Sequence, residues 1–392
     1  MRILIISQYY YPDPFRLQDV AEGLANRGHS VTVLTGTPNY VAGSPFEDKK
    51  NDCRTCTING VTIIRVKTYR RKTSLKSIAL SYASYTLHAS LAALKMKGVY
   101  DVVFVYQLSP ILMAVPAFIY ARKKKRKIAL YCLDLWPESM IGMGITHDHL
   151  LYKFMRLFSR YVYNHVDYLG YTSKLFEDYF QNDLKLYQKR YKYIPQFAED
   201  LYQDIGKKEH AGINYVFAGN IGESQNVENI IRAAKLVKDE RVKWHIVGDG
   251  RNLEKCMLLA QQMQLQEKVI FYGRRPISEM PFFYSIADAM VVTLDDNKII
   301  SYTLPGKVQS YMAAGKAIIG AATGEIPLIM SEAECGLCCE PNSPSSLARI
   351  AENMANADRS QYELKSKKYY LEHFTKDKHI LEIEKMLESL CD

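Results

Sequence analysis

Short apolar runs alternate with longer amphipathic segments along the first half of the chain. The runs are typical of buried strands, and the longer segments have the three- and four-residue spacing of helices. Leu17, Val20 and Leu24 show this spacing, and Gly28 follows as a C-cap that ends the predicted helix. The predicted strands cover residues 2–7, 31–34, 61–66, 102–106, 128–132 and 168–171. This alternation predicts a parallel, doubly wound α/β sheet.

The same alternation starts again after a break near residues 195–212. The second set of predicted strands covers residues 214–218, 242–247, 269–272, 289–294 and 317–320, with helices between them. We therefore predict two Rossmann-like domains, residues 1–195 and 196–375. The segment 376–392 carries an amphipathic helix that we expect to pack back on the first domain. Open sheets of this kind bind ligands at the carboxyl ends of their strands, so two facing domains predict a cleft between them.

Loops suited to phosphate follow three predicted strands of the second domain. Residues 219–222 and 248–250 each hold two glycines, which let the backbone approach a ligand closely. Lys307 lies in the first turn of a predicted helix. The free N–H groups and partial positive charge of a helix N-terminus suit a phosphate, and Lys307 adds a full charge there. The candidate binding residues of these loops are Gly219, Asn220, Gly222, Gly248, Gly250, Pro305 and Gly306.

Charge is distributed unevenly between the two halves. Residues 1–196 hold 28 Lys+Arg and 14 Asp+Glu, a balance of +14, whereas residues 197–392 hold 23 and 28, a balance of −5. Such a basic, tyrosine-rich half suits an anionic partner, and we favour an anionic membrane surface over a nucleic acid. The helix predicted for residues 75–97 is rich in leucine, so it either rests on a membrane or packs in the core.

The cysteines and the apolar runs indicate in which cellular compartment the protein is expected. No apolar run is long enough to span a bilayer, and the eight cysteines are scattered. Cys53 and Cys56 form a single Cys-x-x-Cys pair without the second pair that a zinc site needs. The first residues are typical of a strand and not of a signal peptide. We expect a reduced, cytoplasmic chain that lies peripherally on the inner face of the plasma membrane.

Longer motifs resemble the family 4 glycosyltransferases, whose two-domain α/β architecture is called GT-B. In the second half the motifs are FAGNIG at 217–222, WHIVGDG at 244–250, VIFYG at 269–273 and ADAMVVT at 287–293. In the first half they are YYYPDP at 9–14, GHSVTVLTG at 28–36, PNY at 38–40 and DLWPES at 134–139, which resemble the capsule and O-antigen branch. The resemblance covers nearly the whole chain.

This resemblance implies an activity and a donor site. The family transfers a sugar from a nucleoside diphosphate, retains the anomeric configuration and requires no metal or other cofactor. A UDP-linked donor, such as an N-acetylated deoxyhexose, and a polyprenyl-diphosphate-linked glycan acceptor are the expectations for this branch. Lys307 matches the lysine of the family's donor loop and would bind the leaving diphosphate.

Two positions of the donor loop depart from the family pattern. The family carries two glutamates eight positions apart, one toward the donor sugar and one toward the ribose hydroxyls, and here they fall on Tyr302 and Ser310. A serine hydroxyl can still hydrogen-bond a ribose hydroxyl, but less strongly than a carboxylate. Many members also carry Arg and Lys where this chain has Asn220 and Gln225. Arg274 and Arg275 either replace that charge or are solvated loop residues.

The acceptor side is predicted from the first half. Asp134 or Glu138, which follow a predicted strand, could orient the acceptor hydroxyl or receive its proton. The alternative for Glu138 is a helix cap after Pro137. Arg16 could reach a phosphate. Two other functions remain open: a nucleotide-sugar 2-epimerase of the same fold, and a non-catalytic binding partner in a glycosyltransferase complex, which the missing glutamates favour.

Overall fold

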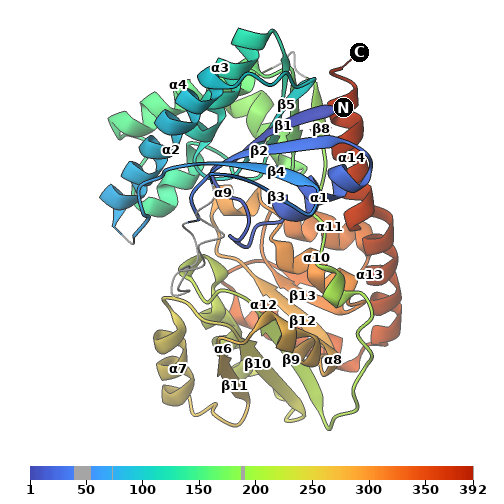
Figure 1. The fold of residues 1–392 in the computed structure, drawn as a ribbon. Helices are drawn as coiled ribbons and strands as arrows, with labels where there is room; N and C mark the ends of the chain where they lie inside the picture. Colours follow the sequence, from blue (N-terminus) through green and yellow to red (C-terminus); the bar gives the residue numbers. More distant parts are fainter. Residues whose placement is uncertain (39–53, 73, 187–189, 392) are drawn as a thin grey trace. The chain divides into compact units, whose positions relative to one another are not determined.

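The computed structural model describes residues 1–38, 54–72, 74–186 and 190–391 (Figure 1). The chain divides into two compact units. Unit 1 holds Met1–Thr172, Phe176–Ile194 and the chain from Ile380 onward, and unit 2 holds Ser173–Leu175 and Pro195–His379. Most of the PNY motif and Cys53, which the sequence singled out, lie outside the described residues.

Unit 1 is built on an eight-stranded sheet in the order β3-β4-β2-β1-β5-β6-β7-β8. Its strands are β1 (Arg2–Ile6), β2 (Ser30–Gly36), β3 (Thr55–Ile58), β4 (Val61–Val66), β5 (Val102–Gln107), β6 (Lys127–Cys132), β7 (Tyr168–Tyr171) and β8 (Tyr191–Tyr193). All neighbours are parallel except β3 and β4. The parallel sheet is as predicted, and β3 adds an antiparallel edge strand that was not predicted. Asn59 and Gly60 both adopt positive φ and form the two-residue hairpin turn that joins β3 to β4.

The helices of unit 1 cover both faces of this sheet. They are α1 (Leu17–Asn26), α2 (Leu75–Lys95), α3 (Val115–Lys124) and α4 (Leu150–His165), with α5 (Leu175–Asp178) at the boundary of the units. Crossovers between parallel strands are right-handed, so α2, α3 and α4 lie on one face and α1 on the other. The last helix, α14 (Lys376–Glu388), belongs to unit 1 from Ile380 on, and its Glu384 carboxylate lies 2.6 Å from His29 Nε2.

Unit 2 is built on a six-stranded, wholly parallel sheet in the order β11-β10-β9-β12-β13-β14. The strands are β9 (Ile213–Ala218), β10 (Val242–Val247), β11 (Val269–Gly273), β12 (Ala289–Thr293), β13 (Ala317–Ala321) and β14 (Gly336–Cys339). The chain moves outward from β9 through β10 to β11, then returns to the other side of β9 as β12. The order therefore reverses between β9 and β12, where doubly wound sheets open a crevice for ligands.

Eight helices of unit 2 surround this sheet among the described residues. They are α6 (Val227–Leu236), α7 (Leu253–Gln262), α8 (Met280–Ser285), α9 (Lys298–Ser301), α10 (Gly306–Ala313), α11 (Glu325–Ala333), α12 (Pro344–Asn356) and α13 (Arg359–His373). The apolar faces of α6 and α12 bury Ile230, Ile231 and Leu347 against Trp244 on β10. Burial of such side chains contributes about 1.5 to 3 kcal/mol each. The sequence analysis missed α13, because that helix is polar and buries only Ser366 and Tyr370.

Candidate functional site

The glycine-rich loops of unit 2 meet at the carboxyl edge of its sheet. Gly219 directly follows β9, and Gly248 directly follows β10, its parallel neighbour. The Gly219 N–H donates to the Val247 carbonyl at 2.9 Å, and the Ile221 N–H donates to the Asp249 carbonyl at 2.8 Å. The two loops are therefore hydrogen-bonded to each other beside the reversal of strand order.

Side chains are excluded where these loops touch. A Cβ placed on Gly248 would lie 1.8 Å from the Gly219 carbonyl oxygen, and a Cβ on Gly250 would lie 2.4 Å from that of Ile221. Both glycines also have positive φ, 144° and 159°. Gly222 has a negative φ, and a Cβ there would meet the Asn220 side chain, which is itself exposed. At Gly248 and Gly250 the loops thus have room for backbone alone.

Helix α10 brings Lys307 to the same edge. Pro305 is its N-cap residue with extended backbone angles, and Gly306 is its first helical residue. A Cβ placed on Gly219 would lie only 3.1 Å from the Lys307 ammonium nitrogen. Lys307 donates to the Gln225 amide oxygen at 2.5 Å, and its nitrogen lies 4.1 Å from the centre of the Phe217 ring. The loop after β9 and the N-terminus of α10 therefore form one site.

The described partners of Lys307 are neutral. Burial lowers the pKa of its ammonium from 10.5 to about 7, and no acidic side chain offsets that cost. An amide oxygen and an aromatic face stabilise a cation only modestly. A diphosphate at this position would supply both the missing negative charge and acceptors for first-turn N–H groups.

A carboxylate lies beside Ser310, one turn further along α10. The Ser310 hydroxyl donates to a carboxylate oxygen of Glu199 at 3.3 Å and to the Gly306 carbonyl at 3.1 Å. Glu199 precedes the short helix η4 (Asp200–Tyr202) and remains partly exposed. Tyr302, the other position where the family has a glutamate, follows α9 and is also partly exposed. One of the two missing carboxylates thus has a counterpart from another segment of unit 2.

The contact of Glu199 with Ser310 could not be predicted from the sequence, because 111 positions separate the two residues and no motif spans them. Of the other predicted donor residues, Arg274 and Arg275 follow β11 and are exposed. Arg275 donates to the Tyr272 carbonyl at 3.2 Å and lies 3.7 Å from the Glu279 carboxylate. Arg275 is therefore partly neutralised on the surface.

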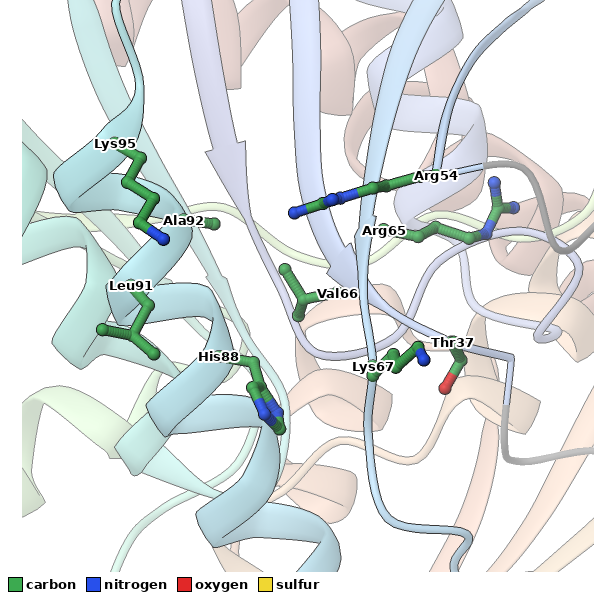
Figure 2. Close-up of a pocket in the computed structure, with 9 residues that line it drawn as sticks. All are labelled: Thr37, Arg54, Arg65, Val66, Lys67, His88, Leu91, Ala92 and Lys95. Carbon is green, nitrogen blue, oxygen red and sulfur yellow. The ribbon is translucent and has the colours of Figure 1, made fainter.

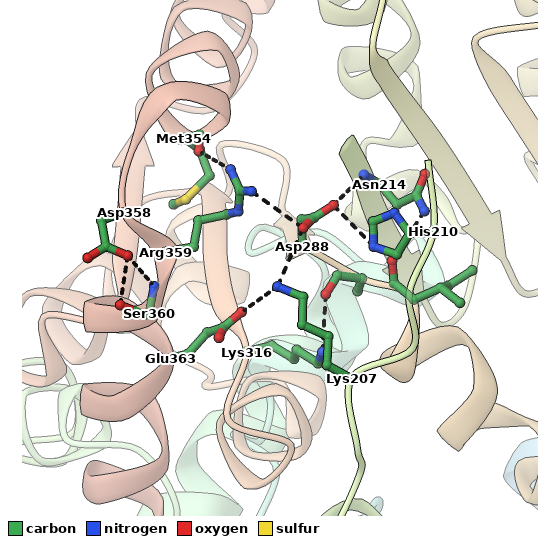
Figure 3. Close-up of polar contacts among 12 residues, drawn as sticks. Lys207, His210, Asn214, Asp288, Lys316, Met354, Asp358, Arg359, Ser360 and Glu363 are labelled. Carbon is green, nitrogen blue, oxygen red and sulfur yellow. Dashed lines mark hydrogen bonds and ion pairs between the residues drawn. The ribbon is translucent and has the colours of Figure 1, made fainter. Parts of the chain in front are cut away.

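The amino edge of the same sheet holds a different arrangement of charge (Figure 3). Asp288, just before β12, is buried and accepts from the Asn214 N–H at 2.9 Å. Its carboxylate lies 3.4 Å from His210, 3.5 Å from Arg359 and 3.7 Å from Lys207. Lys207, His210 and Arg359 thus share one buried carboxylate, and this edge has the character of a structural support.

In unit 1, Asp134 lies in the loop after β6. It accepts hydrogen bonds from the hydroxyls of Ser109 and Ser139. Burial raises the pKa of the Asp134 carboxyl, and these hydrogen bonds oppose that rise. A raised pKa makes a carboxylate a better proton acceptor.

Glu138 lies at the start of the short helix η2 (Glu138–Met143) and is buried. It accepts from the hydroxyls of Tyr152 at 2.8 Å and Tyr179 at 3.0 Å. These contacts tie η2 to two neighbouring helical segments. They favour a structural role, and a catalytic role for Glu138 stays a prediction.

A basic pocket of about 560 Å³ opens between α2 and β4 in unit 1 (Figure 2). Figure 2 shows Arg54 and Lys95 extending toward each other across it. Arg65 turns its guanidinium away and donates to the Tyr11 carbonyl at 2.7 Å. The pocket is lined by Thr37, Arg54, Arg65, Val66, Lys67, His88, Leu91, Ala92 and Lys95, so none of its described lining residues carries a carboxylate. Arg16, the predicted phosphate ligand, is the N-cap residue of α1 and does not line it.

Two family models match the chain. The Glycosyl transferase 4-like domain matches residues 15–196, and Glycosyl transferases group 1 matches residues 200–369. Among curated proteins, "Probable glycosyltransferase WbjE" of Pseudomonas aeruginosa is 27% identical over 263 residues, which cover 64% of each chain. "Putative colanic acid biosynthesis glycosyl transferase WcaI" of Escherichia coli K12 is 24% identical over 88% of this chain and 90% of that protein.

Solved structures share the fold at low identity. The sucrose-phosphate synthase of Thermosynechococcus elongatus has a TM-score of 0.75 and 14% identity, covering 100% of this chain and 99% of that one. Anabaena Alr3699/HepE in complex with UDP has a TM-score of 0.74 and 14% identity over the whole of both chains. The two parallel-sheet units therefore have the GT-B fold. Given the adjoining family matches in both units, the chain belongs to the group 1 glycosyltransferases of the family 4 type.

Proposed function

We propose that this protein transfers a sugar, with retention of configuration, from a UDP-linked donor to a polyprenyl-diphosphate-linked glycan during synthesis of a surface polysaccharide. The observation that carries the proposal is the half-buried ammonium of Lys307, which lies at the N-terminus of α10 beside Gly219 without a described anionic partner. The name of WcaI, which refers to colanic acid biosynthesis, and the UDP bound to HepE support the substrate classes.

The chemistry requires charge stabilisation at the donor diphosphate. The bond between the anomeric carbon and the diphosphate oxygen breaks, and negative charge develops on the departing UDP. Lys307 and the first-turn N–H groups of α10 stabilise that charge, while the backbone of the loop after β9 permits close approach. The resemblance to family 4 implies that this stabilisation requires no metal ion. The donor sugar is proposed to be an N-acetylated deoxyhexose.

Glu199 takes the place of the glutamate that is missing at Ser310. A carboxylate accepts hydrogen bonds from ribose hydroxyls more strongly than a serine does. The 3.3 Å contact between the Ser310 hydroxyl and the Glu199 carboxylate supports this assignment. The non-catalytic alternative drew its main support from the missing carboxylates, and this contact weakens it.

The acceptor is assigned to unit 1. The basic pocket around Arg54, Lys67 and Lys95 suits the diphosphate of a lipid-linked acceptor, because three of its described lining residues are cations that a diphosphate can bind. Asp134 is proposed to receive the proton of the acceptor hydroxyl, with Arg16 contributing to phosphate binding. We place the protein at the inner face of the plasma membrane, bound peripherally to anionic lipid.

Incubation of the purified protein with UDP-sugars and lipid-linked acceptors tests the proposal. We expect acceptor-dependent release of UDP, an unchanged rate in the presence of a chelator, and a product that keeps the anomeric configuration of the donor. Strict dependence on a divalent ion would contradict the metal-independent site. UDP binding without transfer to any lipid-linked acceptor would favour the non-catalytic partner, and acceptor-independent change at C2 of the donor would favour the epimerase.

A further inference from the structure

Two helices of unit 1 present apolar stripes to solvent. The exposed residues recur at i, i+7, i+11 and i+14 along α2 and at i, i+4, i+7 and i+11 along α4. Each spacing keeps the side chains on one side of its helix. The eight residues, between 44% and 81% exposed, are Leu80, Leu87, Leu91, Leu94, Leu150, Phe154, Leu157 and Tyr161. We call this surface the leucine face.

Core packing does not explain the stripe on α2. A surface helix of a globular protein normally turns its apolar stripe toward the core. Here α2 buries small and hydroxyl-bearing residues instead, namely Ser77, Ser81, Tyr82, Tyr85, Ala89 and Ala93. The leucines that the sequence analysis assigned either to the core or to a membrane are on the outside.

Helix α3 joins the two stripes into one layer. Its Lys123 ammonium donates to the Leu94 carbonyl of α2, and its Phe118 ring lies 6.3 Å from the Tyr161 ring of α4. Figure 1 shows the three helices together on the same side of unit 1. The two stripes therefore lie on helices of one packed layer, and exposed apolar side chains gathered in this way mark an interaction site.

The charges of this layer have a single sign. The helices α2, α3 and α4 contain two, three and three Lys+Arg residues and no Asp or Glu. On α4, Lys153, Arg156 and Arg160 recur at i, i+3 and i+7 and are exposed alongside its apolar stripe. By contrast, Leu258 on α7 of unit 2 is exposed on a helix that also carries Glu254. The leucine face thus combines apolar side chains with an excess of cations, although Asp183 lines a pocket with Lys153, Arg156 and Arg160.

We propose that the leucine face docks on an anionic bilayer surface. Leucine, phenylalanine and tyrosine side chains enter the boundary between headgroups and acyl chains, and the flanking lysines and arginines bind lipid phosphates. In the part of the chain that the structure describes, no helix is both long and apolar enough to cross a membrane, so these helices lie on the surface.

This docking surface rests on the proposed function and gives its membrane partner a location. Helices α2 and α4 each follow the carboxyl end of a strand, β4 and β6. Their N-termini therefore lie toward the edge of the sheet that carries Asp134 and Arg16. Docking through these helices holds that edge near the membrane, where the phosphate of a lipid-linked acceptor would lie.

Sedimentation with vesicles tests the docking surface. We expect the protein to bind vesicles containing phosphatidylglycerol, and the double variant Leu87→Glu/Leu157→Glu to bind at least tenfold more weakly. The matched control Leu258→Glu, a similarly exposed leucine of unit 2, should bind as the wild type does. The variant Lys153→Gln/Arg156→Gln/Arg160→Gln should lose the preference for phosphatidylglycerol over phosphatidylcholine and the sensitivity to salt.

Three results would overturn the assignment: no binding of the wild type to these vesicles, equal binding of the double glutamate variant, or a wild-type dimer that this variant dissociates. The last would make a second copy the occupant. Each variant is also titrated with UDP and measured by circular dichroism, which tests whether its fold is kept. Vesicle binding without UDP binding would leave the docking surface standing and contradict the proposed function.

Discussion

At the amino edge of the sheet in unit 2, Asp288 lies among Lys207, His210 and Arg359, whereas at the carboxyl edge Lys307 has a neutral amide and an aromatic ring as its described partners. The first edge holds a buried carboxylate, and the second holds a half-buried amine. At the first edge the partners of that charge come from the chain itself. At the second, we infer, the partner comes with the substrate. The first edge should therefore govern stability, and the second should govern binding and turnover.

Removal of the amine at the carboxyl edge should have the largest effect. Lys307→Ala is expected to lower the rate of sugar transfer by about 10² to 10³-fold, the usual loss for one group that stabilises transition-state charge. Lys207→Ala is the matched control, because it removes an amine from the other edge of the same sheet. Its steady-state rate should stay within about twofold of the wild type. Equal rates for the two variants would remove the distinction between the edges.

The amino edge should show the reverse pattern. Asp288→Ala leaves Lys207, His210 and Arg359 without their buried partner and breaks the hydrogen bond to the Asn214 N–H. Loss of one partner from a buried charge cluster costs about 3 to 5 kcal/mol, so the free energy of unfolding of unit 2 should fall by that order. Urea unfolding measures the change. Transfer activity below the unfolding transition should persist, and a loss of activity without destabilisation would assign Asp288 to the site.

A smaller effect is expected at the ribose position. Glu199→Gln keeps the shape of the side chain and removes its charge, and a hydrogen bond to a charged group contributes about 1.5 to 3 kcal/mol. Affinity for UDP, measured by calorimetry, should therefore fall about tenfold or more, whereas affinity for 2′-deoxy-UDP should change less. Adding Ser310→Glu should restore the preference for UDP. If the Glu199→Gln variant still binds UDP in preference to 2′-deoxy-UDP as strongly as the wild type does, this carboxylate does not recognise the ribose.

The smallest expected effect is on the pH dependence of UDP binding. Free Lys307, with a pKa of about 7, is mostly neutral at pH 8, and a bound diphosphate favours its ammonium form. UDP binding at pH 8 should take up a proton, and affinity should fall as pH rises above 7. Calorimetry in buffers of different ionisation enthalpy measures the uptake, which Lys307→Met should abolish. Proton release on binding would contradict this assignment.

The pH dependence of stability has the opposite sign to the pH dependence of UDP affinity. An unfolded lysine keeps its proton up to a pKa of about 10.4, whereas the folded, ligand-free protein releases it near 7. The unfolded chain therefore binds more protons between these values, and the contribution of Lys307 makes the ligand-free unit more stable as pH rises from 7 toward 10. Below pH 7 both states are protonated, so this contribution no longer varies.

The sequence predicted what depends on local order. Strands, glycines and the lysine of α10 follow one another along the chain, and parallel strands bring their carboxyl ends to one edge. The short strands β8 and β14 were not among the predicted strands. Three other features escaped prediction for physical reasons. Strand β3 depends on the turn at Asn59 and Gly60, helix α13 is too polar for an apolar pattern, and Glu199 reaches Ser310 only through the tertiary fold. The outward orientation of the α2 leucines could not be predicted either. Periodicity shows that they share one side of the helix, but not whether that side faces the core or the solvent.

The contact between the loops after β9 and β10 limits how donor preference can change. Gly248 and Gly250 have no room for a side chain, so an alanine scan would report large losses at residues that offer a ligand nothing but backbone. Such losses would measure the integrity of the scaffold and not recognition of the sugar. Any variation among homologues that selects one donor over another must therefore fall on neighbouring positions with open space, such as Asn220 and Arg274, which are exposed at the same edge.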